Sequence, residues 1–129
     1  MDIGSDLPSP LNSFVIDVPA KHYYDFELPP KSDYPLSGVT YPVDYGHIMG
    51  YTTEDGHELD LFVGTSYEGK CGTIVVFRGE GVPLEHKFYV RLTEDEVSKI
   101  VNELGPVLIS HEEFASMGEL LKTIRMFKD

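Results

Sequence analysis

The spacing of the hydrophobic residues changes at Thr93, and this change constrains the fold more than any other feature of the chain. Before Thr93, apolar residues come in short segments bounded by Pro, Gly and Asp, which are typical of β-strands. We expect strands at 13–18, 22–28, 58–64, 72–77 and 87–92. After that point Thr93-x-x-Glu96 forms a capping box that predicts a helix, and Ser110-x-x-Glu113 predicts a second one. The order predicts a mainly β fold with flanking helices (α+β): a small OB-like barrel, closed or partly closed, plus two C-terminal helices.

The length of the chain, 129 residues, fits one domain with a core that needs no cross-links. The first residues are rich in Pro, Ser and Gly and have no periodicity. We therefore expect a flexible lead-in at 1–13 and a single domain at 14–129. The one cysteine, Cys71, excludes an internal disulfide, and no activating partner adjoins it in the sequence, so we expect an inert thiol.

The charge of the chain is strongly acidic, with 22 Asp and Glu against 10 Lys and Arg and a formal net charge of -12. Such a surface repels nucleic acid and anionic membranes, so we expect neither as a partner. It also repels phosphate-like anions, so an anion site would need cations as intermediaries. No basic start followed by an apolar segment is present, and no apolar run approaches the roughly 18 residues of a membrane span. We expect a cytoplasmic protein.

A short polar segment at 55–60 gathers potential metal ligands. Asp55 stands in an Asp-Gly turn, Asp60 stands in the strand that follows, and His57 lies between them. Carboxylates placed where a turn runs into a strand can converge on one point, and Mg²⁺ prefers such oxygen ligands. The imidazole of His57 suits proton transfer, or a softer metal, and would also allow Mn²⁺ or Zn²⁺. Taken alone, this spacing favours a plain hairpin turn, in which Asp and Gly are common.

Two linked motifs give this turn its context. Residues 41–48 read Tyr-Pro-Val-Asp-Tyr-Gly-His-Ile, and residues 54–63 read Glu-Asp-Gly-His-Glu-Leu-Asp-Leu-Phe-Val. Together they resemble the soluble (family I) inorganic pyrophosphatases, which have Tyr-Pro-x-x-Tyr-Gly-x-Ile followed by Asp-Gly-Asp-x-x-Asp and an apolar strand. The Ile-Asp-Val-Pro segment at 16–19 is similar to the Ile-Glu-Ile-Pro strand of the family. The chain resembles a shortened, divergent member.

The resemblance implies Mg²⁺-dependent hydrolysis of inorganic diphosphate to phosphate. It implies metal ligands at Asp55 and Asp60, and at Glu85 through the Asp-x-Lys pattern that the family carries further on. Asp17, which takes the place of the strand glutamate, and Glu80 are further candidates for acidic site residues.

The resemblance also implies the residues that handle the substrate. Tyr41, Tyr45 and Lys87 would bind phosphate, and Tyr45 and Lys87 would stabilise the charge that develops during reaction. His57 takes the place of the aspartate that acts as the base on the attacking water, and it is the largest departure from the family pattern. For Lys87, an exposed lysine that guards a strand edge is an equally good interpretation.

Some parts of the family site have no match in this chain, notably its substrate-binding arginine and its late Tyr-Lys pair. We therefore expect an attenuated diphosphatase, with diphosphate or a related small phosphorylated ligand as its partner. The alternative is a catalytically degenerate pyrophosphatase-fold protein that acts as a metal- or phosphate-ligand binding or assembly module. A hydrolase of another phosphoanhydride or phosphoester is a third interpretation, since fold does not fix substrate. The resemblance also allows a homo-oligomer.

Overall fold

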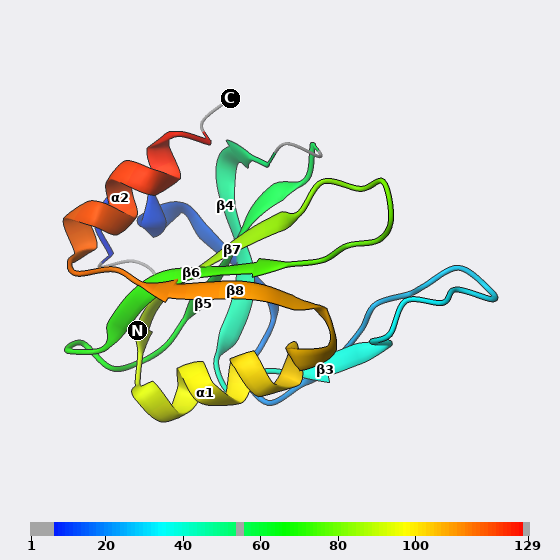
Figure 1. Cartoon of the computed structure of the whole chain (residues 1–129). Coiled ribbons are helices and arrows are strands. Elements are labelled where there is room, and N and C mark those ends of the chain that lie inside the picture. Colours follow the sequence, from blue (N-terminus) through cyan, green and yellow to red (C-terminus); the bar gives the residue numbers. More distant parts are fainter. Residues whose placement is uncertain (1–6, 54–55, 128–129) are drawn as a thin grey trace.

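A computed structural model describes residues 7–53 and 56–127, and these form a mainly β structure with two α-helices (Figure 1). Six strands form one sheet: β1 (Phe14–Val18), β4 (Asp44–Thr52), β5 (Glu58–Val63), β6 (Lys70–Val76), β7 (Glu85–Leu92) and β8 (Leu108–Glu113). A separate hairpin consists of β2 (Tyr23–Asp25) and β3 (Gly38–Thr40). The helices are α1 (Glu94–Glu103) and α2 (Met117–Arg125), with short 3-10 turns η2 (Leu11–Ser13) and η3 (Gly105–Val107).

The large sheet is mixed, with the order β1-β4-β5-β7-β6-β8. Its strand pairs are antiparallel except for β5 and β7, which run parallel and place Asp60 opposite Lys87. Within the described residues no strand pairing joins β1 to β8, the two ends of this order. The mainly β architecture with two helices is confirmed, whereas the closure of the sheet into an OB-like barrel is not.

Each face of the large sheet packs on its own core. The core on the α2 side contains Leu59, Leu61 and Val63 of β5 and Leu120 and Ile124 of α2. The core on the α1 side contains Phe62 of β5 and Tyr89 of β7. Ile100 of α1 and Leu104, the C-cap of that helix, pack in the same core. Burial on both faces explains why β5 reads as a nearly continuous apolar run rather than a clean alternation.

The first helix begins as the sequence predicts. The Thr93 hydroxyl accepts a hydrogen bond from the Glu96 amide, and the Glu96 carboxylate accepts one from the Thr93 amide, which completes the capping box. The second helix is present, but it begins later than predicted. Ser110 and Glu113 lie in β8, and α2 begins at Met117, capped by the hydroxyl of Ser116.

The sequence analysis missed strand β8 for a physical reason. It pairs with β6 at the end of the sheet order, and most of its side chains are exposed, so its residues show no apolar alternation. Strand β4 was also missed, because glycines and a register shift between Ile48 and Thr52 interrupt its pattern.

The N-terminal segment contributes to the α2-side core. Leu7 and Leu11 fall within the stretch expected to be a flexible lead-in, yet both side chains are buried against the domain. Among the described residues, no helix is long and apolar enough to cross a membrane.

Candidate functional site

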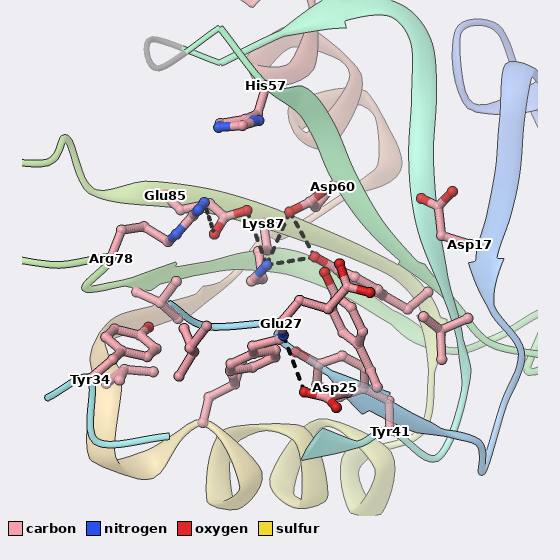
Figure 2. A pocket seen from close by; sticks show the side chains of 18 of the residues that line it. Asp17, Asp25, Glu27, Tyr34, Tyr41, His57, Asp60, Arg78, Glu85 and Lys87 are labelled. Atoms are coloured by element: carbon pink, nitrogen blue, oxygen red, sulfur yellow. Dashed lines mark hydrogen bonds and ion pairs between the residues drawn. The ribbon is translucent and has the colours of Figure 1, made fainter. Parts of the chain in front are cut away.

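A pocket of about 990 Å³ opens on the α1-side face of the sheet. One wall comes from β4, β5 and β7, and the opposite wall from β2 and the loop that follows it (Figure 2). The wall on the sheet follows from strand alternation. Asp60 stands two residues before Phe62, and Lys87 two before Tyr89, so each polar side chain shares the face of a core aromatic. Asp60 and Lys87 thereby line the pocket, and Phe62 and Tyr89 lie in the core beside it.

Lys87 is the centre of the polar wall. Its ammonium donates hydrogen bonds to the Tyr45 hydroxyl at 2.6 Å and to Asp60 Oδ2 at 3.0 Å, and it lies 3.2 Å from Glu85 Oε1. The Tyr45 hydroxyl in turn donates to Asp60 Oδ2 at 2.7 Å. Lys87 is only 6% exposed, so the interpretation as an exposed edge lysine is wrong. Figure 2 shows these side chains converging on one point.

The electrostatic interactions in this network favour the charged forms of Lys87 and Asp60. Burial opposes the charge on Lys87, but the carboxylates of Asp60 and Glu85 outweigh it and raise the lysine pKa well above its ordinary value. Burial also disfavours the charge on Asp60, yet Lys87 and the hydrogen bonds to Glu85 and Tyr45 lower the pKa of Asp60 below its ordinary value. The pKa of Glu85 is raised, first by burial and then by its contact with Asp60.

Arg78 joins the same cluster, and the sequence analysis did not single it out. It follows β6, and its guanidinium lies 2.9 Å from Glu85 Oε2, on the side of Glu85 away from Lys87. Two cations therefore flank the Glu85 carboxylate. The sequence contained a signal for this contact. Arg78 precedes Glu85 by seven residues, and a hairpin between two antiparallel strands can bring residues at that separation together.

The tyrosines of the motif lie under this network. Tyr41 and Tyr45 are both buried, with ring centroids 5.0 Å apart, and each ring packs on Phe62. Burial raises the pKa of both phenols, so both hydroxyls stay protonated. Tyr45 reaches the charged groups directly, whereas Tyr41 supports the ring of Tyr45 from below.

Asp17 lies at the margin of the pocket, where it engages a histidine. His47 Nδ1 is 2.7 Å from Asp17 Oδ2, and His47 Nε2 is 2.8 Å from Glu58 Oε2. The imidazole thus joins two carboxylates across β1, β4 and β5. Asp17 is in this way tied to the strands rather than to Lys87.

The remaining predicted residues are less tightly placed. His57 is exposed and lines the pocket further along the same wall. Glu80 is exposed in the loop before β7 and is not among the residues that line the pocket. Asp55, the first predicted metal ligand, lies outside the described residues.

The side chains that line the pocket include carboxylates, the ligand type that hard divalent cations prefer. Asp60 and Glu85 are in hydrogen-bond contact, and carboxylates outnumber lysine and arginine among the lining side chains. The carboxylates are Asp17, Asp25, Glu27, Glu58, Asp60 and Glu85, and the lysine and arginine are Lys87 and Arg78. In the part of the chain that the structure describes, no three or more His, Cys, Asp or Glu side chains are grouped so that they could hold a metal ion. Asp60 and Glu85 alone do not form such a group.

Comparison with known proteins agrees with the motif. An inorganic pyrophosphatase from Sulfolobus acidocaldarius is 35% identical to the chain over 65 residues, which are 50% of this chain and 35% of that protein. The chain thus spans about a third of the length of this curated relative. No family model matches the chain. No solved structure matches it either. The match supports a pyrophosphatase-like relationship for half of the chain.

Proposed function

We propose that the protein is a pyrophosphatase-like hydrolase that cleaves inorganic diphosphate into two phosphates in the presence of Mg²⁺. The observation that carries the proposal is the network of Lys87, Asp60, Glu85 and Tyr45 at the wall of a large pocket. These residues come from segments separated in the sequence: Tyr45 and Asp60 belong to the motif at 41–63, and Glu85 and Lys87 to the segment that resembles the Asp-x-Lys pattern. The named relative supports the same reaction class.

The acidic lining of the pocket gives the metal its part in the proposal. Asp60 and Glu85 would hold the cation, together with Asp55. Bound there, Mg²⁺ supplies charge that offsets the substrate anion and lowers the pKa of a bound water. The imidazole of His57 suits Mn²⁺ or Zn²⁺ as alternatives.

The chain's own residues would bind and orient the substrate. Lys87 and Tyr45 present an ammonium and a neutral hydroxyl to phosphate oxygens, in a buried setting where such donors act strongly. Tyr41 fixes the ring of Tyr45. The exposed imidazole of His57 would take the proton from the attacking water, since a neutral imidazole nitrogen can act as a general base.

The same geometry implies a reduced rate. The Lys87 ammonium already donates hydrogen bonds to Asp60 and Tyr45, so the substrate has to compete with these acceptors. His57 adds no negative charge beside the carboxylates, which weakens their hold on a cation.

The test is release of phosphate from diphosphate by the folded protein, with Mg²⁺, Mn²⁺ or Zn²⁺ added separately. We expect slow, metal-dependent release, with Mg²⁺ sufficient. Absence of release with all three metals, in protein whose fold is verified by circular dichroism, would rule out the hydrolase.

A second candidate is a catalytically degenerate protein that binds a phosphorylated ligand. The observation favouring it is that Lys87 and Arg78 already neutralise Asp60 and Glu85, as a bound cation would. Calorimetric titration with diphosphate separates the two. A binding module gives a single saturating heat, with or without Mg²⁺, whereas an enzyme gives continued heat from turnover.

A further inference from the structure

The pocket extends well beyond the charged network, along a wall of aromatic rings. We infer that the site accepts a phosphoanhydride that carries a flat ring, namely a nucleoside di- or triphosphate, in preference to bare diphosphate. This inference rests on the proposed function, because it names the substrate class of the same site. Three features of the pocket carry it: its size, its aromatic wall and the position of its charges.

The size of the pocket exceeds what diphosphate needs. Its volume of about 990 Å³ lies at the upper end of the roughly 300–1,000 Å³ typical of pockets for drug-sized organic ligands. Diphosphate is a compact anion that would occupy only the end near Lys87. The remaining space, next to the loop after β2, suits an organic group.

The aromatic wall runs from Tyr45 of the charged network to Tyr34. Ring centroids lie 5.9 Å apart for Tyr45 and Tyr24, 5.3 Å for Tyr24 and Phe26, and 6.3 Å for Phe26 and Tyr34. Tyr24, Phe26 and Tyr34 are half-buried and all three line the pocket. All three rings pack on the edge of the α1-side core, and each keeps part of its surface exposed, unlike Tyr41. Partly exposed faces in a cavity are where a nucleobase can stack, since every base has a flat π-face.

Tyr34 is held rigidly at the far end of this wall. Its hydroxyl donates to the Phe77 carbonyl at 2.5 Å, and its ring stacks on Phe77 with centroids 6.4 Å apart. The next residue, Arg78, carries the second cation of the pocket. Phosphate groups bound next to Lys87 and Arg78, the two cations on either side of Glu85, would leave an attached ring beside Tyr34 and Phe26.

Carboxylates near the aromatic wall favour an organic ligand over a bare anion. Asp25 and Glu27 flank Phe26, are exposed and line the pocket; Asp25 Oδ1 accepts the Glu27 amide at 3.1 Å (Figure 2). Their remaining oxygens can accept hydrogen bonds from ribose hydroxyls or base amino groups. Diphosphate has no such donors when ionised, and these acids repel it.

The reaction of a nucleoside diphosphate then follows the proposed chemistry. The oxygen of water bonds to the terminal phosphorus as the bond from that phosphorus to the bridging oxygen breaks. The products are a nucleoside monophosphate and phosphate, and His57 takes the proton that the water loses.

Calorimetry with uncleavable ligands tests the inference without requiring turnover. The probes are a methylene-bridged adenosine diphosphate and methylenediphosphonate, each titrated into the protein in the presence of Mg²⁺. We expect the nucleoside compound to bind at least about tenfold more tightly, as one base stacked on an aromatic side chain provides. Equal affinities, or tighter binding of the diphosphonate, would overturn the inference.

Variants of Tyr34 identify the aromatic wall as the source of the difference. Tyr34→Leu should lower affinity for the nucleoside compound about tenfold and leave diphosphonate binding unchanged, whereas Tyr34→Phe keeps the ring and should retain most of the affinity. Phe26→Leu, a smaller change in volume, should act like Tyr34→Leu. An unchanged nucleotide affinity in both leucine variants would overturn the inference.

The outcomes distinguish this inference from the proposed function. Diphosphate cleavage by the parent protein, without a preference for the nucleoside compound, refutes the inference and leaves the hydrolase in place. Ring-dependent nucleotide binding without phosphate release from either substrate refutes the hydrolase and supports the ligand class.

Discussion

Asp60 on β5 and Lys87 on β7 stand directly opposite each other in the parallel pair of strands, with the Lys87 ammonium 3.0 Å from Asp60 Oδ2. Parallel strands must be joined by a crossover, and here β6 lies between them in the sequence and beside β7 in the sheet. The ion pair therefore ties together two strands at the middle of the sheet. It also places a buried cation at the wall of the pocket, so one contact serves both fold and site.

Replacement of Lys87 tests this double role. Lys87→Met leaves Asp60 and Glu85 in contact without the ammonium, and we expect the free energy of unfolding to fall by about 3–5 kcal/mol, as for a broken buried pair. Urea denaturation measures it. Lys70→Met is the matched control, since Lys70 forms an exposed ion pair with Glu113. Equal stability of both variants would contradict a structural role for Lys87.

Removal of one hydroxyl probes the network more gently. Tyr45→Phe deletes the group that donates to Asp60 and accepts from Lys87, and we expect a loss of about 1–3 kcal/mol in the free energy of unfolding. Phosphate release should fall further than stability alone explains. Tyr67→Phe, at an exposed tyrosine outside this pocket, should change neither quantity. A Tyr45→Phe variant with the parent's rate would remove Tyr45 from the site.

His57 is the position where the motif and its family pattern differ. A carboxylate there adds negative charge near Asp60 and provides a base, so we expect His57→Asp to raise the rate of metal-dependent phosphate release about tenfold. The control is His111→Asp, an exposed position on β8 that is not among the pocket residues. A lower rate in His57→Asp would mean that a carboxylate cannot replace the imidazole as the base in this site.

Local patterns in the sequence were sufficient for features that depend on neighbouring residues. The capping box at Thr93 and the strand that carries Asp60 are both set by residues within a few positions, and both were predicted. The contact between Asp60 and Lys87 could be expected only through the family resemblance, because the local spacing of apolar residues does not determine the order of strands in a sheet.

Features that depend on distant partners escaped prediction. Strand β8 exists because β6 offers it a partner, although its own residues contain a helix-cap pattern. Arg78 joins the site because the hairpin between β6 and β7 brings it back to Glu85. The aromatic wall of Tyr24, Phe26 and Tyr34 likewise forms only when the loop after β2 folds over the sheet face.

The reactivity of Cys71 tests how well the α2-side core, on the face of the sheet opposite the pocket, is closed to solvent. Cys71 is 8% exposed, its Sγ lies 3.5 Å from the Ser116 carbonyl, and burial raises its pKa. Because the thiolate is the reactive form, we expect slow reaction with a thiol-specific reagent at neutral pH. The same reagent should react rapidly in urea. Rapid reaction of the folded protein would mean that the segment around α2 opens readily.

The close approach of β1 explains why the tyrosine motif has a glycine at position 46. A Cβ at this position would lie 1.8 Å from the Val15 carbonyl oxygen of β1, so any other residue must push β1 away from β4. We expect Gly46→Ala to lower the free energy of unfolding by about 3 kcal/mol, measured by urea denaturation. Gly105→Ala, where the new methyl group meets nothing within 4 Å, should stay within about 0.5 kcal/mol of the parent. Since β1 carries Asp17 and its contact with His47, phosphate release should fall as well. A Gly46→Ala variant with the stability of Gly105→Ala would mean that β1 does not pack this closely on β4.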